Sequence, residues 1–246
     1  MVAVPPRETK DGVRHRRTRL LDLAVLDNAR WCHLVSATWG APGTTDEDAW
    51  TSATRTPPGY PDAVTLRPGV SATELLSRID TSAPGCSVKD SYADLDLSPH
   101  GFQQLFSATW IGGSGTPSPP PPGTTPWQPI GPGDLGAWQA AWAGQPDPEP
   151  RFRPELLAAV GVTLLGARRG RGFTAGCVLT GDDSAVGVSN VFDTGGALET
   201  AWHAILRWTA LHHPAKPVVG YEMGADLAAA LHAGLRPLGP LTVWAT

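Results

Sequence analysis

Hydrophobic residues in the C-terminal half of the chain recur with two spacings, which predict an alternation of strands and helices. Short apolar runs predict strands, whereas apolar residues three and four apart predict helices. Strands are expected at 162–167, 174–180, 185–192, 217–221 and 238–244. Helices are expected at 135–143, 155–160, 197–211 and 227–233. Preceded by one further strand, these elements give the order β-α-α-β-β-β-α-β-α-β.

Capping residues mark several of these boundaries. Asp134 stands where a helix N-cap is expected, and Trp138 and Trp142 follow on one helical face. Pro154 occupies the favoured first position of the next helix. Gly234 is suited to end the last helix.

The N-terminal half carries a weaker pattern. Helices are predicted at 21–38 and 72–79, and strands at 62–66, 86–97 and 105–111. The run that begins at residue 86 is unusually polar for a strand, because it reads SVKDSY from Ser87. Two interpretations remain open for it. It lines a pocket against the C-terminal half, or it is an edge strand on which Lys89 discourages aggregation.

A charge-free segment separates the two halves. Residues 112–126 read GGSGTPSPPPPGTTP, with four consecutive prolines, and such a segment suits neither a helix interior nor a central strand. It predicts an exposed, extended linker. The expected organisation is then a basic disordered arm at 1–20, an α/β module at 21–111 and an α/β domain at 127–246.

Composition and charge exclude several classes of protein. Gly and Pro make up about 22% of the residues, yet they follow no collagen-like period, and 41% of the chain is hydrophobic. No apolar run reaches the roughly 18 residues of a membrane span, and the N-terminus lacks a signal-peptide pattern, so we expect a cytoplasmic protein. Residues 1–20 carry a net charge of +4 and the remainder −8, and this acidic body argues against a nucleic-acid partner.

The three cysteines, Cys32, Cys86 and Cys177, lie far apart and form no metal-binding spacing. We expect free, buried thiols and no metal. The adjacent Cys32 and His33 do not form a nucleophile–base pair, because neighbouring helical residues do not face each other.

Several segments of the C-terminal half, taken in order, resemble the GNAT acyltransferase superfamily. They are the strand VGVSNVF, the loop DTGGA, the helix ALETAWHAILRW, the strand PVVGYE, the helix ADLAAALHAGL and the final RPLGPLTVW. The resemblance covers residues 127–246 and implies an α/β fold, with a mixed, twisted sheet and flanking helices. The N-terminal half is then a smaller, degenerate α/β module.

The two halves also resemble each other. The spacing from Asp94 to His100 parallels that from Asp226 to His232, and apolar residues and a tryptophan follow in both. Two interpretations remain open: a tandem of two related modules with the first one shortened, or chance similarity. The first requires the same strand order in both halves.

The resemblance implies an acyl-CoA donor, with acetyl-CoA as the first expectation. In the family, the splayed central strand contacts the pantetheine arm, and amides of an R/Q-x-x-G-x-G/A loop bind the pyrophosphate at a helix N-terminus. The matching cofactor-binding residues are Val188, Asn190, Val191, Gly195, Gly196 and Ala197. Phe192 stands at the Arg/Gln position and Asp193 adds a negative charge, so an ordinary turn is the alternative. An arginine at 192 is expected to improve CoA affinity.

Acyl transfer to an amine needs a base for the amine proton and an acid for the leaving thiolate. The tyrosine that the family often places four residues before the closing glycine is Ala230 here. By location, Tyr221, Glu222 and His232 are the candidate catalytic residues. Glu222 could act as a base and His232 titrates near neutral pH, whereas the ordinary interpretations are a solvated carboxylate and a surface histidine.

The leading hypothesis is an acyl-CoA-dependent N-acyltransferase that acts on a small amine or amino-acid-like acceptor. One alternative is a non-catalytic GNAT-like binding or regulatory protein. Another is an acyl transferase that uses aminoacyl-tRNA. The RGRG segment at 169–172 is interpreted as a solvated hairpin turn, with a basic lip for a phosphate-bearing substrate as the lesser alternative.

Overall fold

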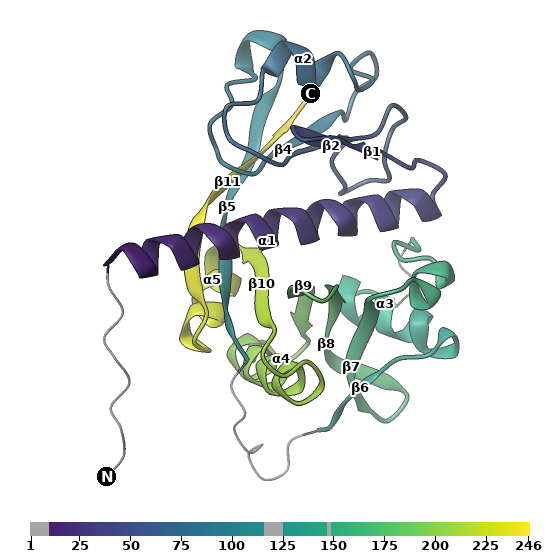
Figure 1. Cartoon of the computed structure of the whole chain (residues 1–246). Helices are drawn as coiled ribbons and strands as arrows, with labels where there is room; N and C mark the ends of the chain where they lie inside the picture. Colours follow the sequence, from purple (N-terminus) through teal and green to yellow (C-terminus); the bar gives the residue numbers. More distant parts are fainter. Residues whose placement is uncertain (1–9, 116–124, 147–148) are drawn as a thin grey trace.

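The computed structural model of the chain describes residues 10–115, 125–146 and 149–246. Within them, one mixed sheet of eleven strands runs in the order β1-β2-β3-β4-β11-β5-β10-β9-β8-β7-β6 (Figure 1). The N-terminal strands are β1 (Thr44–Thr45), β2 (Ala49–Thr51), β3 (Ala63–Thr65), β4 (Ser87–Asp90) and β5 (Gln103–Ser114). The C-terminal strands are β6 (Trp127–Pro129), β7 (Val162–Arg169), β8 (Gly172–Gly181), β9 (Val186–Asp193), β10 (Pro217–Glu222) and β11 (Arg236–Ala245).

The helices flank this sheet. The α-helices are α1 (Lys10–Thr38), α2 (Ala72–Leu76), α3 (Leu135–Ala143), α4 (Leu198–His212) and α5 (Gly224–His232), and the 3₁₀ turns are η1 (Ser98–His100), η2 (Pro132–Asp134) and η3 (Pro154–Ala158). The mixed α/β sheet with flanking helices confirms the predicted fold class. No helix in the described ranges is long and apolar enough to cross a membrane.

The two halves have similar successions of strands, and the last strand of each lies beside strands of the other half. Two antiparallel pairings in the N-terminal half and three in the C-terminal half lead into a parallel pair joined by a helix: β3 with β4 through α2, and β9 with β10 through α4. β11 then lies between β4 and β5, and β5 lies between β10 and β11. The C-terminal half has one further antiparallel strand, β6, beside β7, and the repeat hypothesis stays a prediction.

The observed length of β5 corrects the predicted start of the linker. Strand β5 continues through Ser114, which pairs with Pro217, so the first three residues of the predicted linker are sheet. The strand fits there because a Cβ atom at Gly112 would lie 2.9 Å from Leu238 Cδ1. Residues 116–124 of the predicted linker lie outside the described residues.

The predicted disordered arm also needs correction. Residues 10–20 form the first turns of α1, which begins well before the predicted Leu21. The Nε atom of Arg17 donates a hydrogen bond of 2.8 Å to the carbonyl oxygen of Leu238, which ties these turns to β11. Residues 1–9 lie outside the described residues.

Helix α1 crosses the sheet and contacts both halves (Figure 1). On the C-terminal side, Thr180 donates a hydrogen bond of 2.8 Å to the Asp27 carboxylate, and Arg30 donates one of 2.9 Å to the Gly181 carbonyl. On the N-terminal side, Lys89 donates a hydrogen bond of 2.8 Å to Asn28 Oδ1. Because consecutive turns of one helix contact different halves, α1 fixes the position of each half relative to the other.

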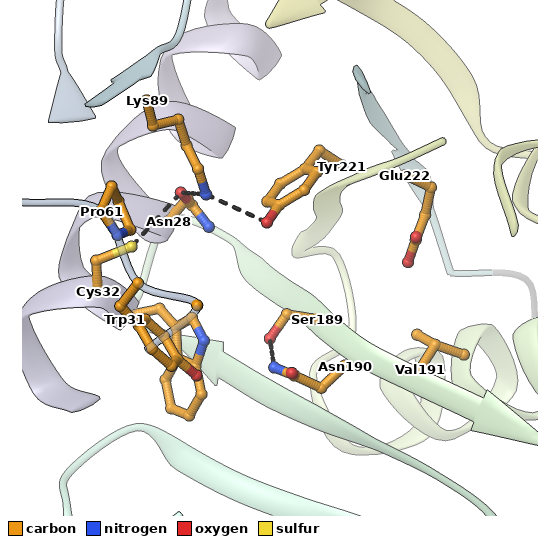
Figure 2. Close-up of a pocket in the computed structure, with 12 residues that line it drawn as sticks. Asn28, Trp31, Cys32, Pro61, Lys89, Ser189, Asn190, Val191, Tyr221 and Glu222 are labelled. Atoms are coloured by element: carbon orange, nitrogen blue, oxygen red, sulfur yellow. Dashed lines mark hydrogen bonds between the residues drawn. The ribbon is translucent and has the colours of Figure 1, made fainter. Parts of the chain in front are cut away.

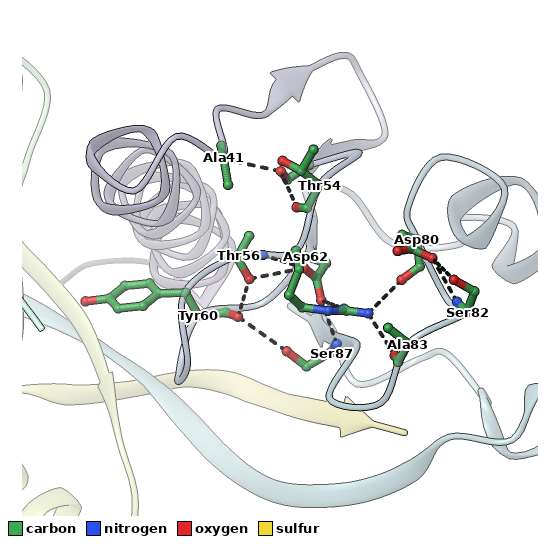
Figure 3. Close-up of polar contacts among 11 residues, drawn as sticks. Ala41, Thr54, Thr56, Tyr60, Asp62, Asp80, Ser82, Ala83 and Ser87 are labelled. Carbon is green, nitrogen blue, oxygen red and sulfur yellow. Dashed lines mark hydrogen bonds and ion pairs between the residues drawn. The ribbon is translucent and has the colours of Figure 1, made fainter. Parts of the chain in front are cut away.

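In the N-terminal half, a buried carboxylate anchors the loop that leads into β3. Asp62 is 1% exposed and forms an ion pair with Arg55 (Figure 3). The Thr56 amide and the Ser87 amide also donate to this carboxylate, at 2.9 and 3.0 Å. The network fixes the loop that carries Gly59, Tyr60 and Pro61 toward the centre of the molecule.

Candidate functional site

A cavity of about 170 Å³ lies where the two halves meet beneath α1 (Figure 2). Three structural parts supply its walls: helix α1, the ends of β4, β9 and β10, and the loop before β3. The lining residues are Asn28, Trp31, Cys32, Gly59, Tyr60, Pro61, Lys89, Ser189, Asn190, Val191, Tyr221 and Glu222. The cavity therefore draws on residues more than 190 positions apart in the sequence.

The strand β9 carries a β-bulge at this cavity. Its pairing with β8 passes from Val178↔Ser189 to Gly176↔Phe192, so β9 has one residue more than β8 over this stretch. Asn190 adopts a left-handed conformation with φ of 53°, as bulged residues do. β10 pairs with β9 only as far as Gly220↔Val188, and beyond it the backbone of Ser189–Val191 has no ladder partner on the β10 side. Backbone groups of β9 are thus available to a ligand.

Strands β9 and β10 pair as far as Gly220 and separate beyond it. Their close approach at this last pair depends on Gly220. A Cβ atom there would lie 2.5 Å from the Val188 carbonyl oxygen. We therefore expect Gly220→Ala to destabilise the protein by about 1–3 kcal/mol, as overpacking does. Urea denaturation would measure this, with Gly136→Ala as the control because no atom lies within 4 Å of a Cβ at Gly136. Equal stability of the two variants would show that the strands separate freely at this point.

Glu222 has the electrostatic character of a base that works near neutral pH. It ends β10 and lines the cavity. Burial, assisted by the nearby negative charge of Asp226, raises the pKa of Glu222 to about 8. The ionised form of such a carboxyl group is a stronger base than an ordinary carboxylate, and its fraction rises with pH toward the pKa of about 8, which suits general-base catalysis at neutral to mildly alkaline pH.

Lys89 and Tyr221 are in direct contact in the wall of the cavity (Figure 2). The Lys89 ammonium donates to Asn28 Oδ1 at 2.8 Å and to the Tyr221 hydroxyl at 3.2 Å, and it lies 4.3 Å from the centre of the Tyr221 ring. The Tyr221 ring packs edge-on against Trp110, with 5.4 Å between centroids. These contacts fix the direction of the Tyr221 hydroxyl.

The loop predicted to bind pyrophosphate holds a carboxylate of the chain itself. Asp193 Oδ1 accepts hydrogen bonds from the amides of Gly195, at 2.8 Å, and Ala197, at 2.9 Å. The Gly196 amide donates to the Asp193 carbonyl oxygen at 3.3 Å. The amides of the loop therefore converge on the Asp193 carboxylate, and binding of a pyrophosphate by this loop stays a prediction.

At position 192 the structure places the side chain in the core, and the effect of an arginine there on CoA affinity stays a prediction. Phe192 is 8% exposed and packs edge-on against Trp138, with 5.2 Å between centroids, so an arginine there would be buried in the core. A different cation stands near the loop: Arg169 lines a hollow of about 540 Å³ together with Thr174, Thr194 and Gly195. The RGRG turn is thus the hairpin between β7 and β8, and its exposed Arg169 lies beside the candidate anion site.

The structure brings some of the predicted site residues together and leaves others apart. Tyr221, Glu222, Asn190 and Val191 line the cavity. His232 does not line the cavity. It lies at the end of α5, where its exposed ring nitrogen Nδ1 is 3.6 Å from a carboxylate oxygen of Glu199. The buried side chain of Val188 belongs to the core between the sheet and α4, and Gly195, Gly196 and Ala197 form the neighbouring loop.

Sequence reasoning missed the contribution of α1 and left that of β4 undecided. Lys89 lies on a central strand, between β3 and β11, so the pocket interpretation of this polar strand is confirmed and the edge interpretation is wrong. Its polarity was the signal that pointed to the pocket. Asn28 and Cys32 gave no comparable signal, and burial raises the pKa of the Cys32 thiol, which makes it a poor nucleophile.

All three cysteines are free and buried, as expected. In the part of the chain that the structure describes, no group of three or more His, Cys, Asp or Glu side chains could hold a metal ion.

Several solved structures, including the following three, have a similar fold. A GCN5-related N-acetyltransferase from Kribbella flavida aligns with a TM-score of 0.59 at 15% identity, over 90% of this chain and 95% of that one. A putative GNAT-family acetyltransferase from Novosphingobium aromaticivorans aligns with a TM-score of 0.56 at 14% identity, over 90% and 97%. A conserved protein of unknown function from Staphylococcus epidermidis aligns with a TM-score of 0.57 at 9% identity, over 82% and 92%.

The sequence matches no protein-family model and no curated protein. The structural matches show that the chain has the GNAT fold. They extend over both halves, whereas the sequence resemblance was confined to residues 127–246.

Proposed function

We propose that this protein is an acyl-CoA-dependent N-acyltransferase, with acetyl transfer to a small amine or amino-acid-like acceptor as the expected reaction. The observation that carries the proposal is the position of Glu222. A carboxyl group with a pKa raised to about 8 lines a cavity at the point where two parallel strands split and a bulge leaves backbone unpaired. The GNAT fold supports the same class of chemistry.

Each step of the reaction has a residue in this cavity to support it. The donor supplies a thioester: its carbonyl carbon forms a bond to the acceptor nitrogen, and its carbon–sulfur bond breaks. Glu222 takes the proton from the amine, which makes the nitrogen nucleophilic. The unpaired backbone of β9 is placed to donate to the oxygen that becomes negative. The Tyr221 hydroxyl, held beside the Lys89 ammonium, donates a proton to the departing thiolate.

The pyrophosphate of the donor would be held at the loop before α4. Three features fit it: two convergent amides at 195 and 197, the N-terminus of a fifteen-residue helix, and the exposed Arg169 beside the loop. One feature disfavours pyrophosphate binding: the Asp193 carboxylate already accepts hydrogen bonds from both amides. Binding therefore requires the pyrophosphate to displace one half-buried side chain.

The non-catalytic alternative rests on this same observation. A loop whose amides are permanently held by Asp193 is a capped turn, and a protein with such a loop would not bind CoA there. The two functions therefore differ in the effect of removing this carboxylate.

Asp193→Ala is expected to tighten acetyl-CoA binding by about fivefold, the equivalent of about 1 kcal/mol, because it frees two amides and removes a negative charge. Calorimetric titration of the parent and the variant would measure this. Asp96→Ala is the matched control, since Asp96 also accepts a bond from an amide two residues later, at 3.0 Å, but far from the loop. Absence of CoA binding by both the parent and Asp193→Ala would support the non-catalytic alternative.

A further inference from the structure

Lys89 is a buried cation without a counter-ion. It is 4% exposed, and the partners of its ammonium are the neutral Asn28 and Tyr221 side chains. Among the side chains that the structure describes, none of the ion pairs involves Lys89. Burial removes most of the hydration of an ammonium group, and hydrogen bonds to neutral oxygens replace only part of it. A negative charge is therefore the group that this position lacks.

The cavity gives a negatively charged ligand access to Lys89. Lys89 reaches the cavity from β4, with β3 and β11 on either side of its strand. Asn28 lies on α1 and Tyr221 on β10, so three elements direct their polar atoms to one point of the cavity wall (Figure 2). An anion in the cavity next to Lys89 would complete the pairing.

The size of the cavity suits a small anionic group. Its volume is about 170 Å³, and a cavity of about 150 Å³ holds a ligand of six heavy atoms such as benzene. A carboxylate on a short carbon skeleton fits this volume. The same cavity contains Glu222, a group suited to a cationic or amine nitrogen.

We infer that Lys89 binds the carboxylate of the acceptor, so that the substrates of this protein are small amino acids, held with the carboxylate at Lys89 and the amino group toward Glu222. The inference deepens the proposed function and rests on it for the transfer step, but carboxylate binding itself needs no donor. It also gives the N-terminal half a role: β4 supplies specificity and β10 supplies the base.

Binding of free amino acids tests the inference without CoA. The probes are glycine, L-alanine and β-alanine, each compared with its carboxamide, which keeps the amine and lacks the negative charge. Ligand-induced thermal shift at millimolar concentration measures binding to the native state. We expect at least one amino acid to bind at least tenfold more tightly than its carboxamide, and Lys89→Met to abolish that difference.

Two further variants separate ligand recognition from folding. Lys216→Met is the matched control, because Lys216 lies at the surface beside Asp182 and Asp183 and should leave binding unchanged. Lys89→Arg keeps the charge and should retain part of the preference for the carboxylate. In the absence of ligand, Lys89→Met should change stability only slightly, because it removes the cost of burying the ammonium together with its hydrogen bonds to Asn28 and Tyr221. A large loss of stability would instead assign Lys89 a structural role.

The outcomes also distinguish this inference from the proposed function. If amino acids bind in a way that depends on Lys89 but CoA does not bind, the role of Lys89 in carboxylate binding is supported and the proposed acyltransferase function is contradicted. Carboxamides and simple amines could instead be acylated at the same rate as amino acids, with no effect of Lys89→Met on these rates. That result would support the proposed acyltransferase function and contradict the role of Lys89 in carboxylate binding. Failure of all three amino acids to bind would overturn it as well.

Discussion

Glu222→Gln is expected to lower kcat/KM for acyl transfer by about 10²–10⁴-fold, the usual contribution of a general base. Glutamine keeps the size and the hydrogen-bonding shape of the side chain but cannot take the proton from the amine. In the parent protein, the base must be ionised to act. The rate should therefore rise with pH and level off above the pKa of about 8, and this rise should be absent from the variant. Thiol release from acetyl-CoA, followed from pH 6 to pH 9.5, would measure both effects.

Stability measurements control for damage to the fold in this variant. The pKa of Glu222 is higher in the folded protein than in the unfolded chain, so the folded state binds the extra proton. Stability should then be lost as the pH rises from about 4.5 to about 8. Glutamine has no such proton to lose, and at pH 9 the variant should be at least as stable as the parent. A variant that is inactive because it is unfolded would contradict this assignment of the base.

Asp62→Ala is expected to destabilise the protein by about 3 kcal/mol, because removal of one partner of a buried ion pair leaves the remaining groups unsatisfied. The carboxylate of Asp62 holds Arg55, the Thr56 amide and the Ser87 amide. Chemical denaturation would measure the change. Asp183→Ala is the control, since Asp183 is fully exposed and its pair with Lys216 spans 3.6 Å; it should leave the unfolding midpoint unchanged. Similar midpoints for both variants would show that the Asp62 network adds nothing to stability.

Local pattern was sufficient to predict the C-terminal half. The strands β7 to β11 and the helices α3, α4 and α5 are found close to the predicted residues, because each has an apolar period of its own and glycine or proline at its ends. Asp226 lies inside the first turn of α5 and does not cap it, since the helix begins at Gly224. In the same region, the predicted helix after Pro154 is only a 3₁₀ turn.

The N-terminal half depends on contacts that no local pattern contains. β1 and β2 have two and three residues, too few to show a period. The predicted strand at 86–97 ends at Asp90, because the Asp90 carboxylate accepts a hydrogen bond of 2.9 Å from the Leu95 amide and turns the chain. Gly112 and its neighbours resemble a linker in sequence, yet they are strand because β10 and β11 pair with them on both sides.

The candidate site was predictable only in part, for the same reason. The resemblance of one half to GNAT proteins pointed to Asn190, Val191, Tyr221 and Glu222, all of which line the cavity. The opposite wall comes from α1 and β4, and β4 reaches it only because β11 of the other half pairs beside it. Asp193 was expected to weaken the anion site by its charge, and the structure shows it bonded directly to the amides of that site.

Amine-dependent release of free thiol from acetyl-CoA tests the central claim most directly. We expect thiol release by the purified protein only when a small amine or amino acid is present, with one acetylated product formed for each thiol and with loss of both in Glu222→Gln. Thiol release at the same rate without any amine, or in Glu222→Gln, or no release with any of the amines tested, would contradict the assignment of this cavity as an acyl-transfer site.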